Sequence, residues 1–323
     1  MPLTLSDSQS LDSMGKRLWP LIEERHYQVS QFLANEEFTL TPPDPSKPLL
    51  HFKLVKDEVS LALHFLHGDG DLIYDTLSIA KTEWIKKNKG IRVYSHDGLG
   101  MSYLGFNYKK EILSNLNVRK AISEALPVAK WIEFKLFNWV TPIQAMNLPQ
   151  YNPEDANQLL DKAGLKKQAN GTRFTLRYYT TPVREGNETA QLVRESLKKI
   201  SIEVMVITLE TSLFFDKIKK GDYDLFSSKW IRFNENEPIK DLLSEKGIRN
   251  YTHYSNDSLQ KRFEQNPNLT LSETKDIIAD DLPFLPLYNW KHGLVLGDRV
   301  MAPDSISDSL DETFRFLSLL DLK

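Results

Sequence analysis

The sequence predicts an α/β protein, because stretches with strand periodicity alternate with stretches with helical periodicity. The clearest example is an expected strand at 174–180, followed by an expected helix at 187–199 and a strand at 203–209. Strands that alternate with helices in this way indicate βαβ units. The length of 323 residues favours about two domains, and 41% hydrophobic residues is normal for a globular chain. We therefore expect two α/β domains.

The composition excludes several classes of function. A net charge of -3 and a pI near 6.2 lack the basic stripe that nucleic-acid binding requires. No apolar run approaches the roughly 18–20 residues of a membrane span. The absence of cysteine excludes thiol nucleophiles, thiolate metal sites and disulfides. The start, MPLTLSDSQSLDS, shows no export signal, which fits either a processed form or a protein without such a signal.

The first hundred residues are expected to mix short helices and strands. Residues 10–24 have helical spacing that Pro20 interrupts, and residues 26–40 read as a hairpin that ends in the turn-rich stretch 41–48. The further elements expected here are a strand at 49–55, a helix at 59–66, a turn at 67–71, a brief strand at 72–73, a helix at 76–88, and strands at 91–95 and 102–108.

The remaining elements follow from periodicity and capping residues. Asn117 is the expected N-cap of a helix at 117–125, and an amphipathic stretch follows Pro127. Asn152 is the expected N-cap of a helix at 153–163, which Gly164 should end. After the βαβ unit we expect helices at 211–219, 238–245, 257–264 and 272–280, and strands at 223–230, 284–290, 292–296 and near the C-terminus.

Five phrases, in a fixed order, resemble the family-5 extracellular solute-binding proteins, which deliver peptides, nickel or sugars to ABC transporters. Each phrase alone is weak, whereas the ordered set over about residues 50–290 is a strong signal. The phrases are His67-Gly-Asp-Gly-Asp71; Tyr103-Leu-Gly-Phe-Asn107 with Val118-Arg-Lys-Ala-Ile122 and Glu124-Ala125; Tyr151-Asn-Pro-Glu-Asp-Ala156 with Leu159-Leu160 and Ala163-Gly164; Gly221-Asp-Tyr-Asp224 leading to Trp230; and Asp281-Leu-Pro-Phe-Leu-Pro-Leu-Tyr288.

The resemblance implies a two-lobed, periplasmic-binding-protein-like α/β fold of the class II type with a truncated first lobe. The first lobe would comprise residues 1–104 and 231–323, and residues 105–230 would form an inserted second lobe. A peptide or other small polar solute would be held in the cleft between the lobes, and hinge closure would be the working motion. The partners implied are the ligand and an ABC transporter permease. No cofactor or metal is implied, and the location implied is periplasmic or extracytoplasmic, with the cytoplasm as the alternative.

Two departures from the family pattern bear on the ligand. Tyr27 aligns with a tyrosine that the family places after a glycine-proline turn, but Glu24-Arg25-His26 precedes it here. The N-terminal part of the first lobe, which precedes this tyrosine in the family, is reduced here to one expected helix. Peptide-binding relatives also place an aspartate after the tryptophan that corresponds to Trp230, where it pairs with the peptide α-amino group. Phe233 stands at that place and cannot accept a hydrogen bond, whereas Arg232 would favour a carboxylate or another anion.

The resemblance implies ligand contacts at Trp230, Arg232, Asn107, Trp139 and Tyr103. Four of the five have a plain alternative: core packing for Trp230 and Trp139, a solvated side chain for Arg232, and a structural hydrogen bond for Asn107.

Other candidate sites have ordinary explanations. Asp69, Asp71 and Asp75 could suggest a calcium loop, but the glycine spacing is wrong and a polar turn is favoured. His64 and His67 could share a helix face as metal ligands, but a surface helix end is favoured. No nucleophile, triad or acid–base pair stands out, so we do not expect an enzyme.

Two functional hypotheses remain. The first is the substrate-binding component of an ABC transporter. The second is a degenerate solute-binding fold that acts as a regulatory or protein-interaction module, which the shortened first lobe and the missing aspartate would favour.

Overall fold

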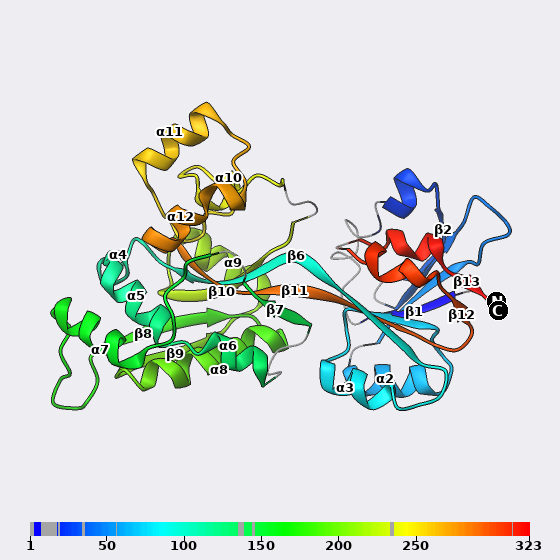
Figure 1. The fold of residues 1–323 in the computed structure, drawn as a ribbon, viewed down its shortest axis with the longest axis horizontal. Coiled ribbons are helices and arrows are strands. Elements are labelled where there is room, and N and C mark those ends of the chain that lie inside the picture. The colour runs from blue at the N-terminus through cyan, green and yellow to red at the C-terminus, as the bar shows by residue number, and fades with distance from the viewer. Residues whose placement is uncertain are drawn as a thin grey trace. The chain divides into compact units, whose positions relative to one another are not determined.

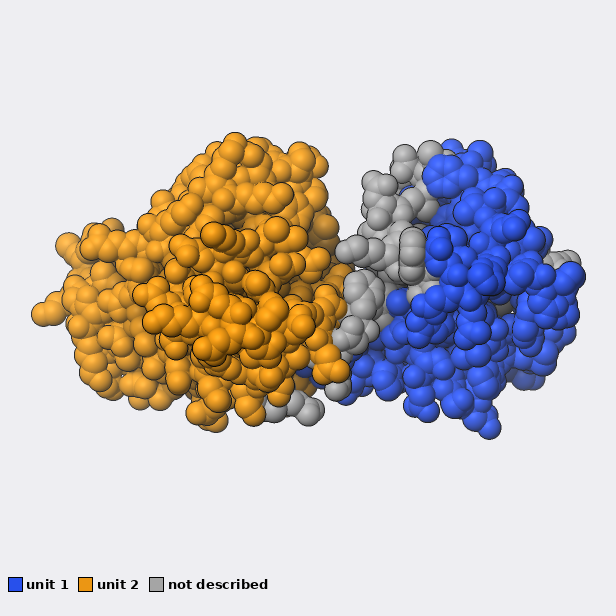
Figure 2. All heavy atoms as spheres, turned by 90° about the horizontal axis from the view of Figure 1, so that it is seen from above, with its two compact units in different colours: residues 1–100, 135–141, 289–323 blue, residues 101–134, 142–288 orange. Residues whose placement is uncertain are grey.

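A computed structural model defines the fold of the chain (Figure 1). The chain divides into two compact units, which are shown in separate colours in Figure 2. Unit 1 comprises residues 1–100, 135–141 and 289–323, and unit 2 comprises residues 101–134 and 142–288. The structure describes residues 3–7, 18, 20–33, 36–55, 57–134, 139–143, 146–232, 236–311 and 313–323.

The sheet of unit 1 has the strand order β2-β3-β4-β1-β5-β11. Strands β2, β3 and β4 form an antiparallel meander, and β1 runs parallel to both β4 and β5. The end of β11 is antiparallel to β5, with Leu294 opposite Tyr74. The strands are β1 (Leu3–Asp7), β2 (Gln28–Leu33), β3 (Glu37–Thr41), β4 (Leu50–Leu54), β5 (Leu72–Tyr74) and β11 (Phe284–Leu296).

Both faces of this sheet are covered, because its strands bury side chains on alternate sides. On one face Phe38, Phe52 and Tyr74 pack with Phe314 and Phe316 from the C-terminal region. The other face carries Ile73 and Val295 under helices α2 (Glu58–Leu66) and α3 (Ile79–Ile85). The short strand β7 (Val140–Pro142) pairs with β11 and reaches the boundary of unit 1. The remaining elements of unit 1 are η1 (Pro20–Glu24), β12 (Val300–Met301), η2 (Asp304–Ser309), η3 (Arg315–Leu319) and β13 (Asp321–Leu322).

The sheet of unit 2 has the order β6-β10-β8-β9. It contains β6 (Arg92–Phe106), β8 (Phe174–Thr180), β9 (Ile202–Thr208) and β10 (Leu225–Trp230). Strands β8, β9 and β10 are parallel, which confirms the expected βαβ unit, whereas β10 is antiparallel to β6. The chain passes into unit 2 inside β6, returns to unit 1 for residues 135–141, and leaves unit 2 for the last time inside β11.

Helices cover the two faces of this sheet differently (Figure 1). Helix α8 lies on one face, and α9 to α12 lie on the other, where they share a core with Phe226, Trp230 and Tyr103. The helices of unit 2 are α4 (Glu111–Ser114), α5 (Leu116–Glu124), α6 (Val128–Glu133), α7 (Pro153–Lys162), α8 (Arg184–Lys198), α9 (Thr211–Lys220), α10 (Lys240–Leu243), α11 (Asp257–Gln265) and α12 (Leu271–Asp281).

The capping predictions were partly right. Asn152 caps α7 as expected, since its side chain accepts a hydrogen bond from the Asp155 N–H, and Gly164 has the left-handed φ of 78° that suits a helix end. Asn117 is not the cap of α5. The helix begins one residue earlier, and Asn115 is its cap because the Asn115 Oδ1 accepts from the Asn117 N–H at 2.9 Å.

Two predicted breaks in strands are wrong. Residues 91–95 and 102–108 were expected to be separate strands, but β6 is one strand from Arg92 to Phe106. Residues 284–290 and 292–296 likewise form the single strand β11. Most of the helix expected at 10–24 lies outside the described residues, and its described end at Pro20–Glu24 is a single π-helical segment.

The last boundary between the units also differs from the one expected. We placed residues 231–323 in the first lobe, whereas residues 231–288 belong to unit 2. The reason is a shared core: Ile239, Tyr254 and Phe263 pack in the same hydrophobic cluster as Phe226 and Trp230. The first boundary, expected after residue 104, lies after residue 100.

Candidate functional site

Trp230 and Tyr103 lie together in the core of unit 2. Trp230 ends β10 opposite Met101, and Tyr103 lies opposite Ser228 on the same face of the sheet. Only 2% of Trp230 and 3% of Tyr103 are exposed. The ring centroid of Tyr103 is 5.0 Å from that of Phe284, and burial raises the pKa of the Tyr103 hydroxyl. Both aromatic side chains therefore contribute packing.

Arg232 is the candidate residue with the most suitable chemistry for a polar ligand. It follows the end of β10, and its guanidinium carbon lies 5.3 Å from the centroid of the Trp230 ring. A guanidinium over the face of an indole gains electrostatic attraction and stays planar for bidentate contact with a carboxylate. The residue is 9% exposed. Phe233, which the resemblance aligns with the aspartate of peptide-binding relatives, lies outside the described residues.

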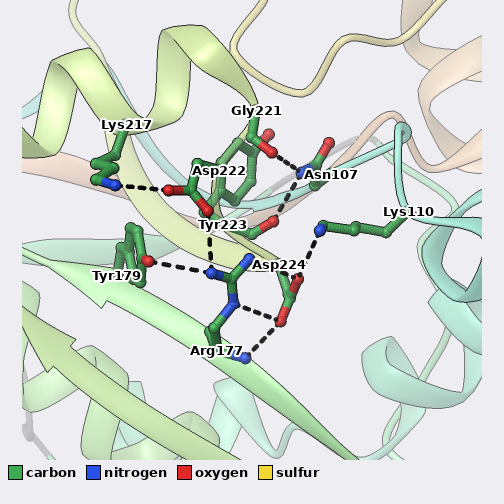
Figure 3. Close-up of polar contacts among 9 residues, drawn as sticks. All are labelled: Asn107, Lys110, Arg177, Tyr179, Lys217, Gly221, Asp222, Tyr223 and Asp224. Atoms are coloured by element: carbon green, nitrogen blue, oxygen red, sulfur yellow. Dashed lines mark hydrogen bonds and ion pairs between the residues drawn. The ribbon is translucent and has the colours of Figure 1, made fainter.

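Asn107 has a structural role in unit 2 (Figure 3). Its side-chain nitrogen donates to the carbonyl oxygens of Gly221 at 2.9 Å and Tyr223 at 2.7 Å. Its Oδ1 accepts from the Lys109 N–H at 3.1 Å, and the residue is fully buried. Both N–H groups of the amide are thus used to hold the end of β6 against the turn before β10. This supports the plain alternative for Asn107.

Trp139 belongs to unit 1, whereas the other candidates belong to unit 2. Its Nε1 donates to the Leu77 carbonyl at 2.9 Å, and its own carbonyl accepts from the Lys291 N–H at 2.8 Å. The ring lies so close to Gly293 that a Cβ there would overlap it. The structure therefore brings together Tyr103, Trp230 and Arg232, places Asn107 further along β6, and leaves Trp139 in the other unit.

A network of charges surrounds the turn at residues 221–224, and the sequence did not reveal it (Figure 3). Arg177 on β8 contacts Asp222 at 3.0 Å and Asp224 at 3.4 Å. Lys217 contacts Asp222 at 2.6 Å, and Lys110 lies 3.9 Å from Asp224. The hydrogen bond from Lys217, followed by that from Arg177, lowers the pKa of Asp222, and Asp222 in turn raises the pKa of Lys217.

This charge network joins β8 and the end of α9 to the turn before β10, and its charged groups are paired with one another. We regard it as a structural element of unit 2, which the Gly-Asp-Tyr-Asp phrase marks in the sequence.

The acidic residues considered for calcium are engaged elsewhere. Asp69 lies 3.0 Å from His64, the Oδ1 of Asp71 accepts from the Arg299 Nε at 2.9 Å, and the Oδ1 of Asp75 accepts from the Gly293 N–H at 2.9 Å. Within the described ranges, no group of three or more His, Asp or Glu side chains has an arrangement that could hold a metal ion.

Comparisons with known proteins agree with this fold. The family model described as "Bacterial extracellular solute-binding proteins, family 5 Middle" matches residues 26–239. The chain is 24% identical over 165 residues to the dipeptide-binding protein of Escherichia coli (strain K12), covering 45% of this chain and 30% of that protein. It is 24% identical over 257 residues to the oligopeptide-binding protein AppA of Bacillus subtilis (strain 168), covering 68% of this chain and 47% of that protein. The chain thus spans half or less of the length of these relatives.

Solved structures show the same fold. The oligopeptide-binding protein AppA from Bacillus subtilis, in complex with a nonapeptide, superposes with a TM-score of 0.72 at 19% identity over 92% of this chain and 66% of that chain. The periplasmic binding protein DppA from Helicobacter pylori, in complex with the peptide STSA, gives a TM-score of 0.73 at 18% identity over 96% of this chain and 67% of that chain. The ordered phrases, the fold and the family match agree, and the chain belongs to family 5 of the bacterial extracellular solute-binding proteins.

Proposed function

We propose that this chain is the substrate-binding component of an ABC transporter and that it binds a peptide-like or other small polar solute. The match of the family model to residues 26–239 is the observation that carries this proposal. Relatives named for dipeptides, oligopeptides and nickel support the choice of a small polar ligand. Binding without chemical conversion is the activity that we propose.

Unit 2 offers a suitable edge for ligand contact. Parallel strands β8, β9 and β10 end on the same side of their sheet, and open α/β sheets commonly bind ligands at the carboxyl ends of their strands. Trp230 is the last residue of β10, and Arg232 follows it. We propose that Arg232 contacts the ligand and that Trp230 supports its guanidinium. Tyr103 would back Trp230 within the core.

Asn107 and Trp139 are weaker candidates within this proposal. Asn107 would act indirectly, because its hydrogen bonds fix the end of β6. Trp139 could present only the part of its ring that does not pack on Gly293.

The chemistry of Arg232 indicates an anionic group on the ligand. A guanidinium donates two parallel hydrogen bonds to a carboxylate, and the Trp230 ring beneath it keeps the guanidinium plane in place. A C-terminal peptide carboxylate or an acidic side chain would satisfy this geometry.

An extracytoplasmic location is part of the proposal. Several relatives are named as periplasmic proteins. No helix in the part of the chain that the structure describes has the length and apolar character to cross a membrane.

The experiment that tests the function is native mass spectrometry of gently purified protein, followed by a thermal-shift screen of peptides, sugars and metal chelates. A ligand that binds only the folded state raises the melting temperature. A co-purified solute or a concentration-dependent shift is expected. If no ligand co-purifies and a broad panel gives no shift, the transport function is rejected, and the alternative of a module without a ligand gains support.

Two variants then test the ligand contact, once a ligand is known. Arg232→Gln should weaken the affinity for an anionic ligand by at least about tenfold, the loss of roughly one charge-assisted hydrogen bond. Arg194→Gln removes the same charge from an exposed ion pair on α8 and should leave the affinity unchanged. Equal affinities of the two variants, measured by titration calorimetry, would exclude Arg232 from the site.

A further inference from the structure

A basic pocket lies on unit 2, beside helix α7. It has a volume of about 480 Å³ and is lined by Asn157, Asp161, Lys166, Lys167 and Arg173. The first two residues come from α7, and the others come from the segment that joins α7 to β8. Cationic side chains outnumber carboxylates in this lining by three to one.

The connecting segment is held in a defined conformation. The Gln168 N–H donates to the Thr172 carbonyl at 3.0 Å, and the Gly171 N–H donates to the Gln168 carbonyl at 2.9 Å, which closes a tight turn. The Arg173 N–H donates to the Ser201 carbonyl at 2.7 Å, so the end of the segment is tied to the strand pair β8–β9. The pocket wall is therefore preorganised.

Arg173 provides a fixed positive charge at this pocket. Only 2% of its side chain is exposed. Its Nη1 contacts the Asp161 carboxylate at 2.6 Å and the Leu165 carbonyl, and its Nη2 donates to the Asn157 Oδ1 at 3.0 Å. Its buried Nε–H has no hydrogen-bond acceptor. A guanidinium carries five N–H groups, so Arg173 keeps donor capacity that the protein does not use.

Lys166 and Lys167 add charge that no described carboxylate neutralises. Both are exposed, and neither has a carboxylate partner among the described residues. The single carboxylate of the lining, Asp161, is already engaged by Arg173. The uncompensated charge of the lining is therefore that of the two lysines, and an anion between them would relieve their mutual repulsion.

We propose that this pocket binds a small oxyanion of the phosphate or sulfate type. Arg173 holds the inner wall of the pocket and contributes a fixed charge, and Lys166 and Lys167 contact the oxyanion from the rim. This site is separate from the solute contact at Arg232, since its residues come from α7 and the segment after it. Binding would tie that segment to α7 and thereby stabilise unit 2.

The test compares the double variant Lys166→Gln/Lys167→Gln with the control Lys198→Gln/Lys199→Gln. The control removes the same charge from two exposed lysines at the end of α8, outside the pocket. Melting temperatures are measured in sodium phosphate and in sodium chloride of equal ionic strength. The wild type and the control should melt about 2 °C or more higher in phosphate. The pocket variant should lose most of this difference.

Titration calorimetry with inorganic phosphate, sulfate and glycerol phosphate identifies the ligand. A similar affinity for all three points to the oxyanion group itself, and a preference for glycerol phosphate points to a phosphate ester. The pocket variant should bind at least about tenfold more weakly than the control. If the pocket variant and the control respond equally to phosphate, the ion is adventitious and the proposal is overturned. A circular dichroism spectrum like that of the wild type shows that the variant is folded.

Discussion

The residue type at position 105 is determined by packing against a residue far away in the sequence, Phe226. Gly105 on β6 lies opposite Phe226 on β10, and a Cβ on Gly105 would overlap the Phe226 ring. The ring occupies the space that a side chain would need, so glycine is required here by packing and not by backbone conformation. The phrase Tyr103-Leu-Gly-Phe-Asn107 thus has a physical reason at its centre.

We expect Gly105→Ala to lower the free energy of unfolding by about 1–3 kcal/mol, since overpacking a filled core costs this much. The measurement is urea unfolding followed by tryptophan fluorescence. In a Phe226→Ala background the same substitution should cost clearly less, because the clash is gone. Equal costs in both backgrounds would show that the Phe226 ring is not the obstacle.

Asp222 makes stability depend on pH. Lys217 and Arg177 lower the pKa of its carboxyl in the folded protein. A lowered folded pKa contributes stability above the unfolded value of about 4, and this contribution is lost as the pH falls below it. Asp222→Asn should therefore lose less stability than the wild type between pH 6 and about pH 3.

The pH measurement is urea unfolding across this range, and Asp276→Asn is the control. Asp276 is an exposed carboxyl on α12 without an ion pair among the described residues. This control should follow the wild-type pH dependence. If Asp222→Asn also follows it, the pairing with Lys217 and Arg177 has no effect on stability.

At the scale of elements, helix α7 illustrates what local sequence can specify. Asn152 caps its start, Pro153 occupies the first turn, and Gly164 follows its end. Each of these signals acts within a few residues, so the sequence was sufficient to predict the helix. The βαβ unit of β8, α8 and β9 was predictable for the same reason, because its periodicity is local.

Replacing the cap of α7 should have a moderate cost. Asn152→Ala removes the acceptor for the Asp155 N–H and should lower the unfolding free energy by about 1 kcal/mol. Asn152→Ser retains a capping oxygen and should remain within a few tenths of a kcal/mol of the wild type. Guanidinium unfolding monitored by circular dichroism distinguishes the two. A serine variant as unstable as the alanine variant would mean that the cap is not the relevant interaction.

Strand β6 shows where local signals mislead. Gly98 and Gly100 lie in the stretch expected to separate two strands, but both are inside the single strand β6. Gly98 lies against the His292 side chain and the Trp290 carbonyl of β11, which leave little room for a Cβ. The glycine thus serves a close approach between chain segments that are far apart in sequence, and local propensity cannot reveal such an approach.

At the scale of the whole molecule, unit 2 has its own core. Every member of the cluster from Met101 to Phe284 belongs to unit 2, and the charge network around Arg177 does as well. A compact unit with its own core can fold alone. We expect the fragment 101–288 to fold and to unfold in one cooperative transition.

The test of the fragment is urea unfolding by fluorescence and circular dichroism, which should give coincident curves. The fragment 105–230 is the comparison, because it follows the boundaries that the sequence predicted. It lacks Ile239, Tyr254 and Phe263 and should expose apolar surface and aggregate. A well-folded 105–230 fragment would show that residues 231–288 are dispensable for the core.

Among the candidate ligand residues, the sequence placed Trp230 correctly at a strand end. It could not distinguish a tryptophan that contacts the ligand from one that packs in the core and supports Arg232. Asn107 looked like a ligand residue until its acceptors were known, and these lie more than a hundred positions along the chain, at Gly221 and Tyr223. In the sequence, only its charge indicated Arg232 as a candidate, and the structure shows that it lies over the Trp230 ring.

The sequence by itself determined the family, the α/β class and most helices and strands, because periodicity, caps and ordered phrases are properties of short segments. Only the tertiary structure decided that residues 231–288 join unit 2, that β6 and β11 are continuous strands, and that Arg177 links Asp222 to Asp224. These features depend on contacts between residues distant in sequence, and the free energy of such contacts outweighs local preference.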